Sequence, residues 1–154
     1  MSIYQTILAD LKSAMKFRDQ QRLNVLRSLK SAIFEKEVSQ RKGGEGEQLT
    51  DEEVVDVLMK SAKQRKDSIQ QYKDAGRTDL AEQEQSELDI LESYLPDMLS
   101  EDEIRDIANE VISDTGASGM QDMGKVMGQI MSRVKGKADG GLVNKVVKEQ
   151  LSSQ

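Results

Sequence analysis

The stretch SYLPDMLSEDE, residues 93–103, contains the only proline of the 154-residue chain. Proline lacks a backbone N–H and pushes the preceding residue out of the helical region, so a helix cannot continue through Pro96. A few residues later, Ser100 and Glu103 have the spacing of a capping box, in which each side chain satisfies a backbone N–H at a helix start. We therefore predict a domain boundary here, with one domain over residues 1–95 and another over residues 96–154.

Upstream of this boundary, apolar residues recur every three or four positions, which predicts four helices. The first two meet near residues 18–19, and the third starts at a second capping box formed by Thr50 and Glu53. The fourth follows a stop at Gly76. A polar, glycine-rich connection is expected over residues 41–47, between the second and third helices.

Downstream of the boundary, the same periodicity predicts three shorter helices separated by loops at residues 115–119 and 135–141. No stretch of useful length alternates with period two, so strands are not expected. The predicted fold is all-α, with a larger N-terminal helical bundle followed by a smaller C-terminal three-helix domain.

The composition removes several classes of function. The chain has no Cys and no His, which excludes thiolate chemistry and leaves out the commonest general base and zinc ligand. Acidic residues at 51–53 and 101–103 fit helix starts better than a metal site, so no metal and no cofactor is expected. Without a long apolar run or a signal-peptide pattern, the sequence predicts a soluble, cytoplasmic protein with no membrane partner.

Charge is distributed unevenly along the chain. Residues 1–42 carry 9 basic and 4 acidic side chains, residues 43–114 carry 7 and 21, and residues 115–154 carry 6 and 3. The net charges are therefore +5, −14 and +3. A polyanion such as RNA would be attracted by the two ends of the sequence and repelled by its middle, although acidic helix faces are often simply solvated.

Two groups of basic residues are candidates for binding an anion. The first lies around residues 16–30, where we favour neutralisation by acidic helices packed alongside. The second surrounds a glycine-rich loop with little acid nearby in the sequence, and glycines let a backbone approach phosphates closely. This second group is the predicted nucleic-acid-binding site, and its members are Lys125, Arg133, Lys135, Lys137 and Lys145. Because the chain has only five aromatic residues, we expect contacts with the RNA backbone or shape and no multi-base stacking platform.

Two other patterns have more ordinary interpretations. Residues 119–126 nearly match a phosphate-binding loop, but Val126 stands where the metal-binding hydroxyl belongs and no buried strand precedes the segment. Met123, Met127 and Met131 recur every four residues on one helix face. Such a methionine stripe either binds a partner or belongs to a core, and we favour the core.

Short motifs spread over the whole chain together resemble the YqeY family. They include Met15-Lys16-Phe17-Arg18-Asp19, Ala75-Gly76-Arg77-Thr78-Asp79-Leu80, Tyr94-Leu95-Pro96, Asp122-Met123-Gly124-Lys125-Val126-Met127 and Lys137-Ala138-Asp139-Gly140. From about Leu99 onward, the chain is also similar to the tail domain of the B subunit of the glutamine-dependent Asp/Glu-tRNA amidotransferase.

The resemblance implies a cytosolic, two-part helical protein linked to tRNA, because the amidotransferase tail helps to hold the tRNA body away from the reacting end. The catalytic centres of that enzyme lie outside the tail, so no catalytic residue is carried over.

We expect a non-catalytic accessory protein that binds tRNA. The alternative is an adaptor that docks another helical protein through Met- and Leu-rich helix faces. A carbon–nitrogen ligase using glutamine, inherited from the family link alone, comes third.

Overall fold

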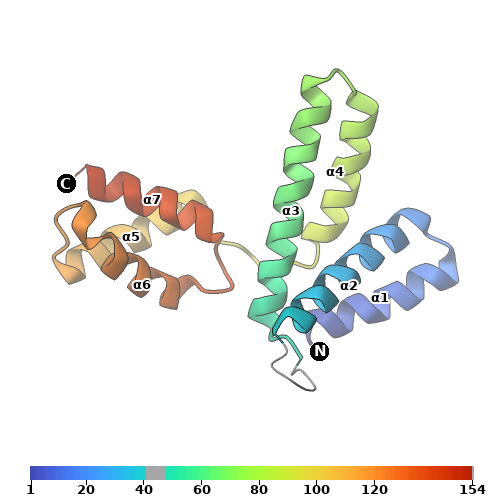
Figure 1. The fold of residues 1–154 in the computed structure, drawn as a ribbon, viewed down its shortest axis with the longest axis horizontal. Coiled ribbons are helices and arrows are strands. Elements are labelled where there is room, and N and C mark those ends of the chain that lie inside the picture. Colours follow the sequence, from blue (N-terminus) through green and yellow to red (C-terminus); the bar gives the residue numbers. More distant parts are fainter. Residues whose placement is uncertain (41–47, 154) are drawn as a thin grey trace. The chain divides into compact units, whose positions relative to one another are not determined.

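The structure, a computed structural model, describes residues 1–40 and 48–153. Its helices are α1 (Ile3–Phe17), α2 (Gln20–Gln40), α3 (Asp51–Asp74), α4 (Thr78–Glu92), α5 (Glu101–Thr115), the short 3₁₀ helix η1 (Met120–Asp122), α6 (Met123–Val134) and α7 (Gly140–Ser152). The predicted all-α fold is confirmed, since the described ranges contain helices and no strand (Figure 1). The glycine-rich connection predicted over residues 41–47 lies outside the described residues.

Contacts along the chain divide it into two compact units, Met1–Pro96 and Asp97–Gln154. Each unit has its own apolar core, one centred on residues such as Leu26 and Leu58 and the other on residues such as Ile104 and Ile130. That each unit is a domain able to fold alone stays a prediction.

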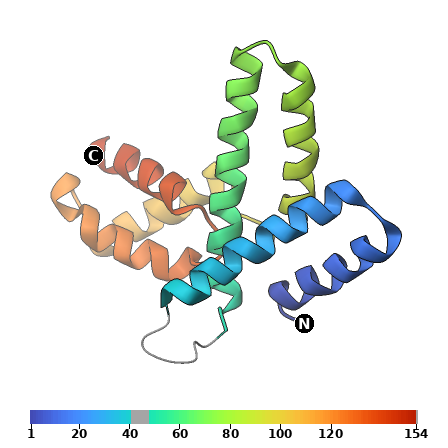
Figure 2. The ribbon, with the colours of Figure 1, turned by 45° about the vertical axis from the view of Figure 1, so that its right-hand side comes forward.

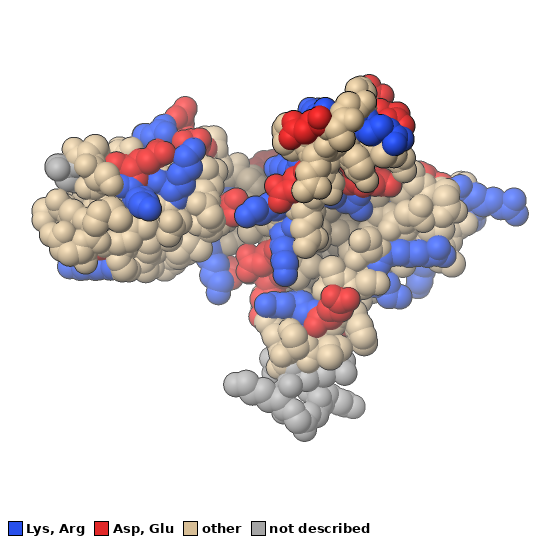
Figure 3. Space-filling view, turned by 45° about the horizontal axis from the view of Figure 1, so that its top comes forward, with Lys and Arg blue, Asp and Glu red and all other residues tan. Residues whose placement is uncertain are grey.

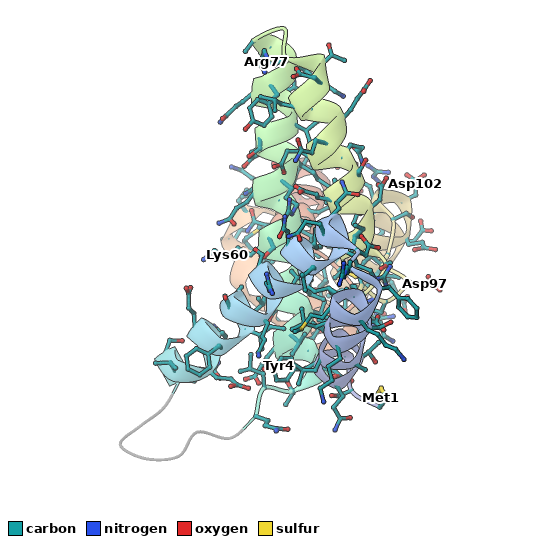
Figure 4. All side chains as sticks on the ribbon, turned by 90° about the vertical axis from the view of Figure 1, so that its right-hand side faces the viewer. Met1, Tyr4, Lys60, Arg77, Asp97 and Asp102 are labelled. Atoms are coloured by element: carbon teal, nitrogen blue, oxygen red, sulfur yellow. The ribbon has the colours of Figure 1, made fainter. Side chains whose placement is uncertain are left out.

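The first unit consists of two helical hairpins, α1–α2 and α3–α4. The α1–α2 hairpin lies across one end of α3–α4, and the other end of α3–α4 extends beyond it (Figures 1 and 2). Figure 4 shows Arg77 at that outer end, on the turn between α3 and α4. The buried stripe of α2, including Leu26, Leu29 and Ile33, packs among the other helices of the unit.

The second unit is a three-helix arrangement in which α5, α6 and α7 contact one another. Its core is made by the inward faces of these helices, and Met123, Met127 and Met131 are partly buried against it. The interpretation of the methionine stripe as part of a core is confirmed.

Local sequence signals explain most of the helix starts and ends. Thr50 with Glu53, and Ser100 with Glu103, form both hydrogen bonds of a capping box, as predicted. Gly76 and Gly116 have positive φ angles just beyond the ends of α3 and α5, a conformation that glycine adopts without a steric penalty. Arg18 ends α1 in the same left-handed region, although it is not glycine.

Candidate nucleic-acid interface

The five predicted cations are spread along α6, α7 and the connection between these helices. Lys125 lies in the first turn of α6 and Arg133 in its last turn, while Lys145 lies on α7. Lys135 and Lys137 belong to the intervening connection. Ten residues separate Lys125 from Lys135, mostly in a helix, which corresponds to about 15 Å of helical rise. All five side chains are exposed, but they form an extended track, whereas a small anion would require a compact site.

Helix α5 brings carboxylates to two of these cations. Arg133 Nη2 lies 3.3 Å from Glu110 Oε2, and Lys145 Nζ lies 3.9 Å from Glu101 Oε1. Arg105 shares Glu101 with Lys145, at an N–O distance of 3.1 Å. The prediction of little nearby acid is therefore wrong, because the packing of α5 against α6 and α7 places residues 101–114 beside residues that are remote in sequence.

The net charge of the folded C-terminal unit is opposite in sign to that of its basic segment, residues 115–154. Residues 97–154 contain 7 basic and 10 acidic side chains, so the unit carries 7 − 10 = −3 charges, whereas residues 115–154 alone carry +3. Attraction to a polyanion must therefore come from the local placement of cations rather than from the total charge.

In the glycine-rich connection before α7, several backbone groups are already paired within the protein. The Lys137 N–H donates to the Val134 carbonyl at 2.8 Å, and the Leu99 N–H donates to the Lys137 carbonyl at 2.8 Å. Asp139 is the N-cap of α7, and its Oδ1 accepts a hydrogen bond from the Gly141 N–H at 3.1 Å. The expected close approach of phosphates to this backbone is not supported, because a carboxylate already occupies the start of the helix.

Three cations of this unit are available through their side chains. Among the residues that the structure describes, the ammonium groups of Lys125, Lys137 and Lys148 take part in no ion pair. Lys148 was not among the predicted residues, although its position three residues after Lys145 on one helix was a usable signal. The candidate interface is therefore the α6–α7 track of exposed cations, in which Lys125, Lys137 and Lys148 make no ion pair with a described residue. Lys135 lies between Lys125 and Lys137 along the chain, and Glu110 and Glu101 already engage Arg133 and Lys145.

Residues 119–126, which nearly match a phosphate-binding loop in sequence, serve instead to connect α5 to α6. Residues 119–122 form a turn and η1 between α5 and α6, and Lys125 already belongs to helix α6. Asp122 Oδ2 accepts a hydrogen bond from the Ser118 N–H at 3.0 Å, so this side chain closes the loop. Asp122 is also the N-cap residue of α6, but its side chain makes no capping hydrogen bond with that helix.

The first basic group, around residues 16–30, behaves differently from what the sequence predicts. Only Arg22 is tied to other elements, donating to the Tyr94 hydroxyl at 3.2 Å and lying 3.6 Å from Asp10 of α1. The other members make no ion pair within residues 1–40 and 48–153 and are exposed: Lys16, Arg18, Arg27 and Lys30. Neutralisation by the acidic helices α3 and α4 is therefore wrong for this group.

Neither a metal centre nor a membrane-spanning helix is present among residues 1–40 and 48–153. No group of three acidic side chains in these ranges is placed to hold a metal ion. None of the described helices combines the length and apolar character needed to cross a membrane.

Comparisons with known proteins agree on one family. The family described as Yqey-like protein matches residues 4–151 of this chain. A protein of Pyrenophora tritici-repentis named "Altered inheritance of mitochondria protein 41, mitochondrial" is 30% identical over 149 residues, which cover 95% of this chain and 79% of that protein. Proteins with the same name from Lachancea thermotolerans and Saccharomyces cerevisiae are 38% and 36% identical over 86 residues, which cover 56% of this chain and 44% of each relative.

These names contradict the prediction of a cytoplasmic protein, since each of these relatives is named as mitochondrial. The prediction relied on the absence of a membrane-spanning run and of a signal-peptide pattern, and on the family resemblance. None of these grounds distinguishes one aqueous compartment of a cell from another, so the cytoplasmic prediction is wrong for the family as these relatives represent it.

Proposed function

Because the chain belongs to the Yqey-like protein family, we propose that it is a non-catalytic accessory protein that binds folded tRNA through its C-terminal unit. The observation that carries this proposal is the track of exposed cations on α6 and α7, in which Lys125, Lys137 and Lys148 have no acidic partner among the described residues. The resemblance of the same unit to a tRNA-holding tail domain supports the choice of ligand.

The spacing of the track favours a nucleic-acid backbone over a small anion. Lys125 and Lys137 lie near opposite ends of α6, so one phosphate cannot contact both. An RNA backbone presents many phosphates in succession, and each cation that contacts one releases condensed counterions. Binding through such contacts is sensitive to shape and position but carries little base specificity.

Acidic neighbours limit the strength of this interaction. Glu101 and Glu110 already engage two of the cations, and the unit as a whole is negatively charged. We therefore expect an affinity of about 10⁻⁴ to 10⁻⁶ M at physiological salt, the range typical of electrostatic binding without base readout.

The test is fluorescence anisotropy with labelled tRNA at several salt concentrations. Replacement of Lys125, Lys137 and Lys148 together by Ala should weaken binding at low salt and reduce the salt slope by up to about three units. The matched control replaces Lys63, Lys66 and Lys73, exposed cations of α3, and changes the net charge equally. Equal losses in both variants would show that only the total charge matters, and no binding at low salt would rule out the proposal.

An adaptor that docks another helical protein is the second candidate. The Met face expected to serve it packs against the core, but Phe34 and Val38, one turn apart on α2, are 53% and 44% exposed. Apolar docking on this face would persist at high salt, whereas phosphate contacts would not. Salt-resistant capture of a partner that is lost in Phe34→Ser would favour the adaptor.

A further inference from the structure

An aromatic side chain stands in solvent at the end of the α1–α2 hairpin. Phe17, the last residue of α1, is 75% exposed, and it is not part of the core of the first unit. The Lys16 ammonium lies 5.8 Å from the centre of the Phe17 ring, within the range of a cation–π contact. The ring is thus held beside a positive charge while most of its surface stays open.

The next residue, Arg18, has a backbone conformation that an arginine rarely adopts. Its φ and ψ are 56° and 34°, in the left-handed region, where a Cβ atom is unfavourable. The other positive-φ positions among the described residues are all glycines: Gly76, Gly116 and Gly136. The Arg18 guanidinium makes no hydrogen bond or ion pair with any described residue, so this side chain contributes nothing visible to the fold that would offset the strain.

The surroundings of the tip are strongly basic. Residues 12–22 contain Lys12, Lys16, Arg18 and Arg22, of which only Arg22 is engaged by another element, and a single acidic residue, Asp19. The Asp19 carboxylate is turned to the start of α2, where its Oδ1 accepts a hydrogen bond from the Arg22 N–H at 3.2 Å. Figure 3 shows Lys and Arg side chains gathered over this end of the hairpin, at the right of the view.

We propose that the tip of the α1–α2 hairpin binds single-stranded RNA, with one unpaired base stacked on Phe17 and the adjacent phosphates held by Lys12, Lys16 and Arg18. Every base has a π face that stacks on an aromatic ring, and the neighbouring cations follow the backbone. Unpaired nucleotides are accessible for stacking, whereas duplex bases are not. This site lies on the other unit from the α6–α7 track and does not depend on it.

Other occupants fit the tip less well. Residues 18–22, which follow the ring, are Arg, Asp, Gln, Gln and Arg, so a membrane would receive only Phe17 and the half-exposed Met15 among polar side chains. A protein interface is usually centred on a cluster of anchors that become buried, and the tip offers one ring with only Met15 as an exposed apolar neighbour. An unpaired nucleotide, which needs one stacking surface and nearby cations, matches this arrangement.

The experiment uses the full chain with Lys125, Lys137 and Lys148 already replaced by Ala, so that the C-terminal track does not mask the tip. Labelled single-stranded oligonucleotides and a duplex of equal length are titrated by anisotropy. We expect preference for the single strand, and Phe17→Leu, which keeps an apolar side chain without the ring, should weaken single-strand binding about tenfold. Lys63→Ala on α3 is the control and should have no such effect.

Arg18→Gly separates the proposed role from a structural one. It should weaken binding and reduce the salt slope by about one unit, while the midpoint of thermal unfolding rises because the strain is removed. The proposal is wrong if duplex and single strand bind equally, or if Phe17→Leu leaves RNA binding unchanged. It is also wrong if Phe17→Leu affects only binding to anionic lipid vesicles or to an acidic peptide.

Discussion

The Tyr94 hydroxyl donates a hydrogen bond of 2.6 Å to Asp10 Oδ2, joining residues 84 positions apart. Arg22 donates to the same hydroxyl at 3.2 Å, so one polar cluster connects α1, α2 and the segment that follows α4. Tyr94 itself is 9% exposed. The cluster fastens the chain to the first core immediately before Pro96.

This cluster makes the stability of the protein sensitive to alkaline pH. Burial, together with the hydrogen bond to Asp10, raises the pKa of Tyr94 to about 12. The folded state therefore favours the neutral phenol more than the unfolded state does. The contribution of Tyr94 to the free energy of unfolding is complete below pH about 10 and is lost as the pH rises to about 12. The free energy of unfolding in urea should fall more steeply over this interval in the wild type than in Tyr94→Phe. Parallel pH curves for the two proteins would contradict the assignment.

A second prediction concerns Arg65, which connects α3 to α4. Its Nη1 lies 3.1 Å from Glu84 Oε2 and 2.8 Å from Glu87 Oε2, and the arginine side chain is only 18% exposed. Arg65→Met should lower the free energy of unfolding by about 1 to 3 kcal/mol, because two partly buried carboxylates lose their shared partner.

The control for this change lies on the same hairpin. Arg77 pairs with Asp79 at 3.1 Å, but both side chains are more than half exposed. Exposed pairs contribute little, so Arg77→Met should change the free energy of unfolding much less than Arg65→Met does. Equal decreases in the free energy of unfolding of the two variants would show that burial does not determine the contribution of Arg65 and its two carboxylates.

Features that depend on neighbouring residues were predictable from the sequence. The capping boxes at Thr50 and Ser100, the junction near residues 18–19 and the helix stop at Gly76 all arise from interactions within one or two turns. The all-α class followed from the helical period of the apolar residues, and the packing of the methionine stripe followed from its place in that period.

Features set by tertiary packing were not predictable in the same way. Nothing local indicates that Glu110 approaches Arg133, or that Arg22 meets Tyr94 and Asp10. Sequence charge sums treated residues 115–154 as an isolated basic segment, whereas packing adds the acidic helix α5 to the same unit. The strained backbone of Arg18 also escaped notice, because an arginine at a helix end is unremarkable until its φ angle is known.

A third prediction compares two glycines that differ in backbone conformation. A Cβ atom added at either Gly128 or Gly116 would meet nothing within 4 Å, so neither substitution is limited by space. Gly128 lies within helix α6, and Gly128→Ala should raise the free energy of unfolding by about 0.5 to 1 kcal/mol. Gly116 has a φ of 68°, which is unfavourable for a residue with a Cβ atom. Gly116→Ala should therefore lower the free energy of unfolding by about 1 to 2 kcal/mol. Urea unfolding of both variants checks the opposite signs.

The fourth prediction is that the two units fold independently when separated at Pro96. Tyr94 belongs to the first core, and the Leu99 N–H bonds the Lys137 carbonyl within the second unit, so each unit is anchored on its own side of the proline. Fragments 1–96 and 97–154 should both give helical circular-dichroism spectra and cooperative unfolding in urea.

The control fragment ends at residue 84, which removes most of α4 and the Tyr94 cluster from the first unit. It loses the buried residues Leu88 and Leu91 as well, and should unfold at a much lower urea concentration than fragment 1–96 or not fold at all. Fragment 97–154 is the stricter test of independent folding, because a 58-residue unit buries a smaller share of its surface than the longer fragment 1–96 does. If it is unfolded alone and becomes helical only when fragment 1–96 is added, the second core depends on the first and the boundary at Pro96 does not separate two domains.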